Sequence, residues 1–428
     1  MSTRFTCLLA TVLLLSIGFL LACGTNYHSN TDGLIVVPSL GSAVVQSFSF
    51  DLNNGHIAEL NNGDGPVLPG PPQQSGPSQI VMDPAGAFAY VAESVGVSCA
   101  GGPGGIQGAI VTYKVKSDGT LSTNGDPMNV GPCPGNTLVG LTIDSAGKFL
   151  FVASQLTATT EGTPIPGNVH VFAIGSGAAL TEVPGSPFAV PVPSGGMTPN
   201  PSALAVSHTA FPVTNAPCTN GAAPSNEYVY VTDLNNNDVL EYSVDPSSGT
   251  LTAQPPSVAI PGFPAGTNPS GVVVDPCDRF LYVANQLSNN VSAYIICNGI
   301  PPSSSACSTP NWSLIPAPGS PFVAGDGPGP LAVDPTASFV YVVDVTGSQI
   351  SGYRISGANG ALQALSPPTV PTNSMPEAIV IRGDDSWVFV ANSASANVSQ
   401  YLLTPSTGAL TPQSPVETDN FPWSVAVK

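Results

Sequence analysis

The sequence predicts an all-β fold: a seven-bladed β-propeller whose blades each contain four antiparallel strands. Three observations predict it. Only 8% of residues are charged, while 45 Gly and 46 Pro interrupt the chain, and long amphipathic helices need charged outer faces. A unit of four short strand-like runs recurs along the chain. The chain also starts with an incomplete unit and ends with the missing piece, which is how a propeller closes its ring.

Residues 1–23 have the features of an export signal. Arg4 precedes an apolar run that ends at Leu21 and is too short to favour spanning a hydrocarbon core of about 30 Å. The run leads into Leu20-Leu21-Ala22-Cys23, with Leu at −3, a small residue at −1 and Cys at +1. This pattern resembles the bacterial lipoprotein signal, in which the cysteine is lipidated and becomes the new N-terminus. The alternative is an ordinary secretory signal with a chance cysteine.

The lipoprotein resemblance implies an address for the protein. We expect export and lipid anchoring through Cys23 to the bacterial cell envelope, at the outer membrane if there are two membranes. The membrane is then a partner through that lipid. Residues 24–33 are polar and are expected to form a short tether. Residues 34–428 are expected to form the propeller.

One repeat shows the expected blade most clearly. It has an apolar run that ends in Val274-Asp275-Pro276, a second run, Phe280 to Asn285, and an alternating run from Val291 to Ile296. We name these strands a, b and c; strand d follows a glycine turn. β-Branched and aromatic residues bounded by Gly, Pro, Asn and Asp are typical of strands, and Asp-Pro favours a turn. The a strands are expected near residues 78–82, 137–143, 202–206, 270–274, 330–333, 377–381 and 423–427.

The two ends of the repeat region complement each other. The last a strand, Trp423 to Val427, ends the chain without its b, c and d strands. Leu34 to Val37, Val44 to Phe50 and His56 to Leu60 look like b, c and d strands without an a strand. We therefore expect the C-terminal strand to be the innermost strand of the blade that the N-terminal strands complete.

The distance from strand b to strand c supports this assignment. In five blades, the β-branched residue of strand c stands six positions after the residue that ends strand b, and an aromatic residue follows three positions later. The pairs are Ser39 and Val45, Asp233 and Val239, Asn285 and Val291, Asp344 and Ile350, and Asn392 and Val398. The other two blades carry insertions, at residues 94–109 and 155–168.

Six cysteines beyond Cys23 are predicted to form disulfides, because an even number in an exported chain favours pairing. In a propeller the b–c and d–a loops lie at one end of the ring, here the first face, and the a–b and c–d loops at the other, the second face. Two cysteines fall on the first face and four on the second, which leaves three pairings. We favour Cys99–Cys133, Cys218–Cys277 and Cys297–Cys307; free buried thiols are the alternative.

Several motifs resemble those of the lactonase family of seven-bladed propellers, which has Tyr-Val-Thr-Asn repeats and includes 6-phosphogluconolactonases. They are Val274-Asp275-Pro276, Tyr282 to Asn285, Gly319 to Phe322 and Thr407 to Thr411. The resemblance covers about residues 34–428. It implies hydrolysis of a sugar lactone at a funnel formed by the first-face loops. The motifs belong to the scaffold, so they do not identify catalytic residues.

The charge balance restricts the partners. The formal net charge of −18 disfavours nucleic acid, which is bound through Lys and Arg. A phosphosugar lactonase needs such residues for the phosphate, and the bases beyond Arg4 lie in a–b turns or along outer c strands rather than at the funnel. Whether the protein is an enzyme therefore stays open. The alternative is a non-catalytic surface propeller, expected to be a monomer, that binds a glycan, peptide or partner protein.

Two groups of residues are candidates for a site. His208 follows an a strand and is placed to reach the second-face mouth of the central channel, where it is a candidate general base; His170, between Val169 and Val171, is expected to point outward. The residues that end strand b are predicted to line the ligand funnel, and their oxygen atoms suit Ca²⁺; the alternative is that they cap the turn and that the protein has no cofactor. These residues are Glu93, Asp233, Asn285, Asp344 and Asn392.

Overall fold

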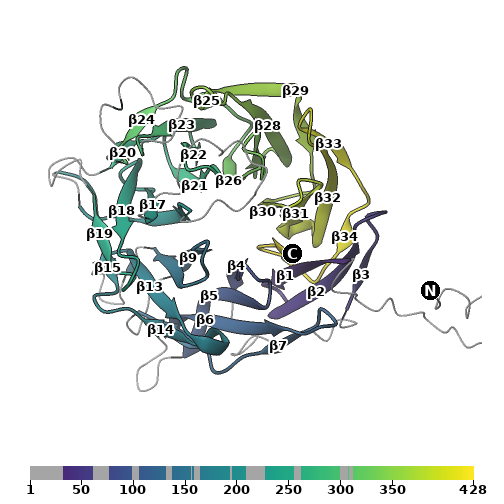
Figure 1. Cartoon of the computed structure of the whole chain (residues 1–428), viewed down its shortest axis with the longest axis horizontal. Coiled ribbons are helices and arrows are strands. Elements are labelled where there is room, and N and C mark those ends of the chain that lie inside the picture. Colours follow the sequence, from purple (N-terminus) through teal and green to yellow (C-terminus); the bar gives the residue numbers. More distant parts are fainter. Residues whose placement is uncertain are drawn as a thin grey trace, which may run out of the picture.

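The computed structural model describes residues 32–60, 77–98, 106–131, 137–155, 157–158, 164–192, 195–208, 227–254, 262–298, 307 and 312–428. These residues form seven antiparallel sheets and a separate two-stranded hairpin. The seven sheets surround a central axis, which confirms the predicted seven-bladed propeller (Figure 1). Within the described residues, no helix has the length and apolar character needed to cross a membrane.

Each blade places strand a nearest the axis, followed outward by strands b, c and d. The a strands are β4 (Pro77–Met82), β9 (Leu138–Ile143), β16 (Pro201–Val206), β21 (Pro269–Val274), β26 (Pro328–Val333), β30 (Pro376–Ile381) and β35 (Ala426–Val427). The b strands are β1 (Asp32–Ser39), β5 (Phe88–Ser98), β10 (Phe149–Ser154), β17 (Glu227–Asp233), β22 (Phe280–Asn285), β27 (Phe339–Asp344) and β31 (Trp387–Asn392).

The c and d strands complete the blades on the outside. The c strands are β2 (Val44–Asp51), β6 (Ile106–Val115), β13 (Asn168–Ile174), β18 (Asp238–Val244), β23 (Asn290–Ile296), β28 (Gln349–Ile355) and β32 (Asn397–Thr404). The d strands are β3 (Ile57–Glu59), β7 (Leu121–Thr123), β14 (Leu180–Glu182), β19 (Leu251–Ala253), β24 (Leu314–Pro316), β29 (Leu362–Pro371) and β33 (Ala409–Pro412). We number the blades 1 to 7 in the chain order of their b strands.

The hydrophobic core is divided among the contacts between blades. Seven clusters of buried side chains each join two neighbouring blades. One of them, for example, packs Phe151 of blade 3 against Val231 and Tyr242 of blade 4. Neighbouring blades cover both faces of the b strands. Strands such as β10 and β27 are therefore buried along their whole length, and their sequences are nearly continuous apolar runs.

The ring closes as predicted. β35 pairs antiparallel with β1, with Ile35 opposite Val427 and Val36 opposite Ala426. The Lys428 amide donates a 2.9 Å hydrogen bond to the Leu34 carbonyl. Closure gives the inner edge of β1 a partner, so that this edge is not left open to other chains.

The six-residue spacing between strands b and c reflects one turn geometry. The residue that ends strand b pairs with the residue five positions later, as Asp233 does with Asp238 and Asn392 with Asn397. The residue just before the c strand has a positive φ in all five of these blades. These residues are Ala43, Asn237, Asn289, Ser348 and Ala396, with φ between 50° and 56°. The spacing is therefore fixed by a four-residue turn whose last residue is left-handed.

The outer strands depart from the prediction of one strand d per blade. Five blades carry a further short strand that pairs with the far end of strand c, so that the outer edge consists of two pieces. These strands are β8 (Met128–Val130), β15 (Phe188–Ala189), β20 (Phe263–Pro264), β25 (Phe322–Val323) and β34 (Val416–Glu417). In blade 6 the long β29 pairs along β28 with a register shift instead.

The second piece of the outer strand serves the contact between blades. The repeated tyrosine of strand c donates a hydrogen bond from its hydroxyl to a carbonyl on the outer strand of the preceding blade. Tyr353 Oη lies 2.6 Å from the Val323 carbonyl oxygen, and Tyr401 Oη lies 2.8 Å from that of Pro371. These tyrosines, which the sequence spacing identified, therefore join neighbouring blades by a hydrogen bond and also pack in the core.

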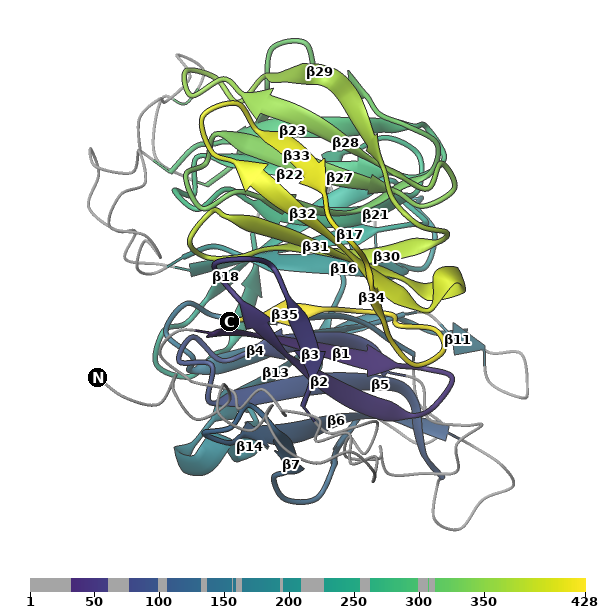
Figure 2. The ribbon, with the colours of Figure 1, turned by 90° about the vertical axis from the view of Figure 1, so that its right-hand side faces the viewer.

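The two faces of the ring are distinct. The hairpin of β11 (Thr157–Ala158) and β12 (Pro164–Ile165), which forms part of one predicted insertion, and the short helix η2 (Ser393–Ser395) lie on the first face. A second short helix, η1 (Ser176–Ala178), lies in a c–d turn on the second face. Figure 2 shows β11 at the right edge of the ring and the C-terminus on the opposite side.

Candidate functional site

A pocket of about 660 Å³ opens at the second-face mouth of the central channel. The ends of four neighbouring a strands and the turns that follow them form its wall. The side chains of the described residues that line it are mostly aliphatic, and none of these residues is Lys or Arg. The lining residues used below are Met82, Thr142, Asp144, Val206, His208 and Val273.

Among the residues in this wall, His208 is the candidate for accepting a proton in a reaction. It follows β16 directly, and 22% of its side chain is exposed. Its Nδ1 lies 2.8 Å from Oδ1 of Asp278, and its backbone amide donates to the same carboxylate at 3.0 Å and 3.1 Å. An ionised Asp278 accepts from Nδ1–H, so the neutral imidazole carries its lone pair on Nε2. The carboxylate thus fixes both the tautomer and the position of the ring.

Asp278 reaches His208 because of its place in the a–b turn of blade 5. This turn position is left-handed in several blades, with φ of 63° at Gly86, 66° at Gly147 and 53° at Ala337. Asp278 has a φ of 54° there, and its side chain is completely buried. Blades 5 and 7 thus have an aspartate at this position, Asp278 and Asp385, and the Asp278 carboxylate reaches across to blade 4.

The electrostatics of the pair favour a charged imidazole. Burial lowers the pKa of His208, but its hydrogen bond to Asp278 and the charges of Asp278 and Asp275 outweigh burial, so that the pKa lies above 6.5. An opposite charge within hydrogen-bonding distance favours the protonated form.

Two more carboxyl groups lie near the pair. Asp144 lines the pocket and accepts backbone hydrogen bonds from Lys148 and Phe149 at 2.6 Å and 2.9 Å. Glu227, at the start of β17, is 3% exposed, and burial together with the charges of Asp144 and Asp278 raises its pKa to about 8. The Lys148 ammonium group donates instead to the Pro246 carbonyl at 2.7 Å. This end of the channel therefore disfavours an anionic ligand.

The predicted ligand funnel is not formed by the residues that end strand b. Asp233, Asn285, Asp344 and Asn392 are at most 1% exposed, and each is bonded within its own blade. Asp233 Oδ1 accepts from the amides of Asn200 and Asn235 at 2.9 Å and 3.0 Å. These side chains thus cap the b–c turn and the d–a loop, which was the alternative interpretation, and the prediction that they line a funnel was wrong.

Asn285, Asp344 and Asn392 show the same capping with different partners. Asn285 Oδ1 accepts from the Gly266 amide at 3.0 Å. Ser351 Oγ donates to Asp344 at 2.7 Å, and Thr372 Oγ1 donates to Asn392 at 2.9 Å. The turns need an acceptor at this position, so the repeat of oxygen-bearing residues follows from the turn rather than from a ligand.

Glu93 is the exception in this group. Its carboxyl group is fully buried and has no hydrogen-bond partner among the described residues. Burial raises its pKa to about 8, so the group is largely neutral at pH 7. Within the described part of the chain, no three His, Cys, Asp or Glu side chains are grouped to hold a metal ion, and no geometry there supports the Ca²⁺ suggestion.

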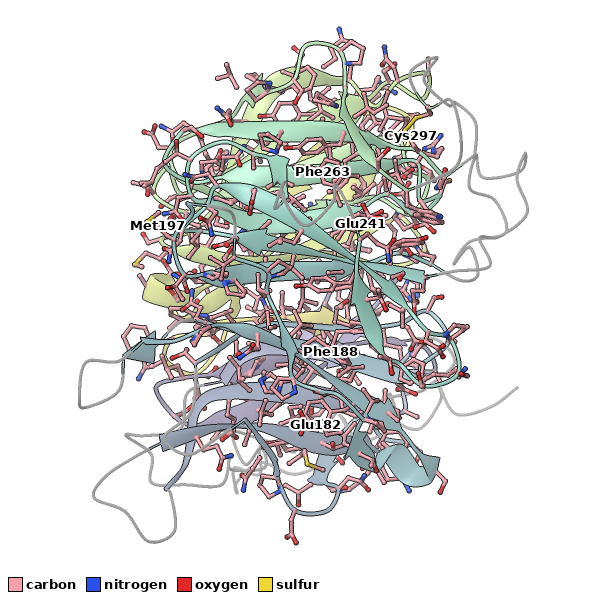
Figure 3. The ribbon with its side chains drawn as sticks, turned by 90° about the vertical axis from the view of Figure 1, so that its left-hand side faces the viewer. Glu182, Phe188, Met197, Glu241, Phe263 and Cys297 are labelled. Atoms are coloured by element: carbon pink, nitrogen blue, oxygen red, sulfur yellow. A yellow bond between two sulfur atoms is a disulfide. The ribbon has the colours of Figure 1, made fainter. Side chains whose placement is uncertain are left out.

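His170 is buried rather than outward-pointing, which corrects the sequence-based expectation. It is 2% exposed, and its Nδ1 lies 3.1 Å from Glu182 Oε1 on the adjacent β14. Figure 3 shows Glu182 and Phe188 on the two outer pieces of blade 3. The second outer piece, which the sequence did not reveal, covers this part of β13, so an alternating strand pattern misled the prediction.

Only one of the three predicted disulfides lies entirely within the described residues. Cys297 and Cys307 form a disulfide on the second face, as predicted. Cys277 is also disulfide-bonded. Cys23, Cys99, Cys133 and Cys218 lie outside the described residues, so their lipidation and pairings stay predictions.

The sequence placed His208 at the channel mouth but did not reveal Asp278. The two are 70 positions apart and lie in different blades. A signal did exist: Asp278 stands where the aligned turns of blades 2 and 3 have Gly86 and Gly147. Blade 7 also has an aspartate there, Asp385, so an aspartate in place of glycine marks two turns, of which the Asp278 turn is one.

Comparison with known proteins relates the chain to lactonases. Residues 215–424 match the model of the family described as lactonase, seven-bladed β-propeller. A 6-phosphogluconolactonase of Erwinia tasmaniensis is 22% identical over 303 residues, which cover 71% of this chain and 76% of that protein.

Solved structures show the same fold over nearly the whole chain. A periplasmic gluconolactonase of Pseudomonas aeruginosa superposes with a TM-score of 0.66 at 17% identity, covering 93% of this chain and 99% of that one. A candidate 6-phosphogluconolactonase of Bacteroides uniformis gives a TM-score of 0.68 at 16% identity, with the same coverage of 93% and 99%. Residues 215–424 therefore resemble the lactonase family of seven-bladed β-propellers, and the whole described ring has the fold of that family.

Proposed function

We propose that the protein hydrolyses an uncharged lactone in the pocket at the second-face mouth of the channel, with His208 as the general base. The observation that carries the proposal is the His208–Asp278 pair in the wall of that pocket. A histidine held by a buried carboxylate is a common arrangement for accepting a proton from a nucleophile.

The reaction needs one water molecule and no cofactor. His208 Nε2 accepts a proton from the water as its oxygen attacks the ring carbonyl carbon, and the carbonyl oxygen gains the negative charge. When the carbonyl re-forms, the bond to the ring oxygen breaks, and the imidazolium gives its proton to that oxygen. The product is an open hydroxy acid, and Asp278 keeps the imidazole oriented and stabilises the imidazolium throughout.

The composition of the pocket favours a substrate without phosphate. Its described lining includes Asp144 and has no Lys or Arg. A phosphate group is usually held by guanidinium or ammonium groups or by helix N-termini. The name of the gluconolactonase relative describes an unphosphorylated lactone and a periplasmic protein, which supports both this substrate class and an exported enzyme.

We also propose that the protein is exported and lipid-anchored to the cell envelope through Cys23. The support is the Leu20-Leu21-Ala22-Cys23 pattern after an apolar run. Metabolic labelling with a clickable palmitate analogue tests it. We expect label on the wild type and none on Cys23→Ala; equal label on both proteins would contradict the anchor.

The experiment for the activity is a pH-stat assay of acid release with glucono-δ-lactone, δ-valerolactone and 6-phosphoglucono-δ-lactone. We expect a rate above spontaneous hydrolysis with at least one of the two uncharged lactones, and a lower kcat/KM for the phosphorylated one. A preference for the phosphorylated lactone would contradict the substrate class. Hydrolysis of all three lactones at no more than the spontaneous rate would contradict the proposed activity and favour a non-catalytic propeller.

A further inference from the structure

The exposed large apolar side chains gather on one face of the ring. Within the described residues seven such side chains are between 41% and 84% exposed, and six of them lie in or beside the b–c and d–a loops of the first face. We call these six the apolar collar. They are Val192, Met197, Leu287, Val323, Met375 and Phe421. The seventh, Leu402, lies in β32 near its second-face end.

The positions of the collar residues follow from the strand order. Met197 belongs to the d–a loop of blade 4 and is bonded to the b–c turn of that blade, since its amide donates to Asn236 Oδ1 at 2.9 Å. Leu287 lies in the b–c turn of blade 5, and Val323 pairs with Asn290, the first residue of β23. Figure 3 shows Met197 at one edge of the ring and Cys297, from the second face, at the other.

The positively charged side chains lie at the opposite end of the ring from the apolar collar. The chain has eight Lys and Arg residues, and the seven beyond Arg4 all stand in a–b turns, at or just after the second-face ends of c strands, or at the end of β35. They are Lys114, Lys116, Lys148, Arg279, Arg354, Arg382 and Lys428. The described part of the first face therefore has no Lys or Arg, whereas Asp326 and Glu417 are exposed there. An apolar surface with acids and no bases complements a basic amphipathic segment.

Two residues of the apolar collar also have a left-handed backbone conformation, which is unfavourable for a bulky side chain. Met375 precedes the proline that begins β30 and Phe421 precedes Pro422 in the segment that leads to β35, with φ of 52° and 59°. The same position holds Asn268 in blade 5 and Gly327 in blade 6, residues that adopt a left-handed conformation readily. Bulky residues are uncommon there. The backbone disfavours both residues, and about half of each side chain stays exposed, at 49% for Met375 and 51% for Phe421. A contact outside the fold would account for a bulky apolar residue at each position.

We propose that the first face docks a basic, amphipathic segment of a partner protein on the apolar collar. A second copy would bring the same acids to this face, and an anionic lipid surface would be repelled by them. β1 begins on the second face, at Asp32, so the tether expected from Cys23 leaves from the opposite end of the ring. The inference does not depend on His208 or on lactone hydrolysis.

The test uses a synthetic ten-residue peptide of alternating Leu and Lys as the basic amphipathic probe. Binding to the protein is followed by fluorescence anisotropy, with a Leu–Glu peptide of the same length as control. We expect the Leu–Lys peptide to bind in a salt-sensitive manner and the Leu–Glu peptide to bind at least tenfold more weakly. Equal binding of the two peptides would overturn the proposal.

The matched variants locate the surface. The double variant Met375→Asn/Phe421→Asn places at both positions the residue type that blade 5 has there. It should weaken binding of the Leu–Lys peptide at least tenfold, while the melting temperature of the protein stays the same or rises. Leu402→Asn removes an exposed apolar side chain from the other end and should leave binding unchanged. An equal loss with Leu402→Asn, or no loss with the double variant, would overturn the proposal.

The other occupants are distinguished by two measurements on the same proteins. Light scattering that shows a wild-type dimer which the double variant cannot form would assign the collar to a second copy and overturn the proposal. So would flotation of the wild type, but not the double variant, with vesicles of phosphatidylcholine and phosphatidylglycerol. A wild type that stays monomeric and vesicle-free supports docking of a protein segment.

Discussion

Buried carboxylates of the a–b turns are stabilised mainly by backbone amides. Asp334 Oδ1 accepts from the amides of Ser338 and Phe339 at 2.7 Å and 2.6 Å. Asp275 makes the same kind of contact and adds an ion pair, with Arg279 Nη2 at 2.8 Å from its Oδ2. The Asp275 turn contains a buried arginine, whereas the Asp334 turn has Ser338 at the equivalent position.

The first prediction at this scale compares those two turns. Asp275→Asn leaves the guanidinium of Arg279, which is 4% exposed, buried without its charge partner, and removing one partner of a buried pair costs about 3–5 kcal/mol. Asp334→Asn loses no ion pair and should cost about 1–2 kcal/mol. Denaturant unfolding of both variants measures the difference, and equal losses would show that the ion pair adds nothing.

The second residue-scale prediction concerns pH. His208 must be neutral to accept a proton, and its pKa lies above 6.5 because Asp278 favours the imidazolium. The rate should therefore be low at acidic pH and rise as His208 loses its proton, with the midpoint of kcat/KM above pH 6.5. A profile corrected for spontaneous hydrolysis checks this, and a midpoint below 6.5 would place another group in the role of base.

At the scale of the element, the c–d turns show how the repeat joins blades. Gly408 has a φ of 76°, and a Cβ added there would lie 2.4 Å from the ring of Phe339 in the preceding blade. Gly360 meets Phe280 in the same way, and Gly55 meets Trp387 across the closure of the ring. The glycine of the turn thus has two roles, a left-handed backbone and a close interblade contact.

The third prediction separates these two roles. Gly408→Ala should cost about 3 kcal/mol, because a strained backbone adds to overlap with a buried ring. Gly125→Ala has a comparable φ of 82° and no atom within 4 Å of the added Cβ, so it should cost about 1 kcal/mol. Thermal unfolding of both variants is the measurement, and the same loss in each would remove the packing role.

The elements themselves were largely predictable, and the outer edges were not. Strand positions follow from runs such as Phe339 to Asp344, whose composition is dictated by burial between two blades. The second outer strands are as short as two residues, for example β15, and no periodicity shows in so short a run. That gap in the prediction also led to the wrong orientation of His170.

The whole molecule is held together by its closure. Besides the pairing of β1 with β35, backbone hydrogen bonds join residues 423–428 to β1 at both ends of the contact: the Trp423 amide donates to the Pro38 carbonyl, and Leu34 and Lys428 exchange two bonds. Val425 and Ala426 add buried apolar surface to this contact. The closing strand was predictable because incomplete repeats at the two ends fit each other.

The fourth prediction removes the closing strand. Deletion of residues 422–428 should cost more than about 3 kcal/mol, since the hydrogen bonds made by Trp423 and Lys428 contribute about 1 kcal/mol each and the β1–β35 pairing and the apolar contacts add to them. The freed edge of β1 should also promote association. Lys428→Gln is the control, because it keeps the backbone contacts. Light scattering and thermal unfolding check both effects, and a stable, monomeric truncated chain would contradict closure as a source of stability.

The candidate site shows what sequence patterns leave out at the scale of the molecule. The repeat predicted where each loop lies, and hence that His208 is near a channel mouth. It did not show that Asp278 crosses from the next blade, because contact between two loops depends on the twist and spacing of the blades. The residues that end strand b misled for a related reason: a turn requirement repeated in every blade looks like a ring of ligands.

The most direct test of the central claim is acid release from an uncharged lactone by the wild type, His208→Gln and His170→Gln. Glucono-δ-lactone or δ-valerolactone is used, whichever the wild type hydrolyses. His170 also pairs with a carboxylate, at 3.1 Å from Glu182, but it lies in the outer part of blade 3, near Gly131 of blade 2, and does not line the pocket. We predict that His208→Gln lowers kcat/KM about 100-fold or more and that His170→Gln leaves it unchanged. Equal activity of the wild type and His208→Gln would contradict the account.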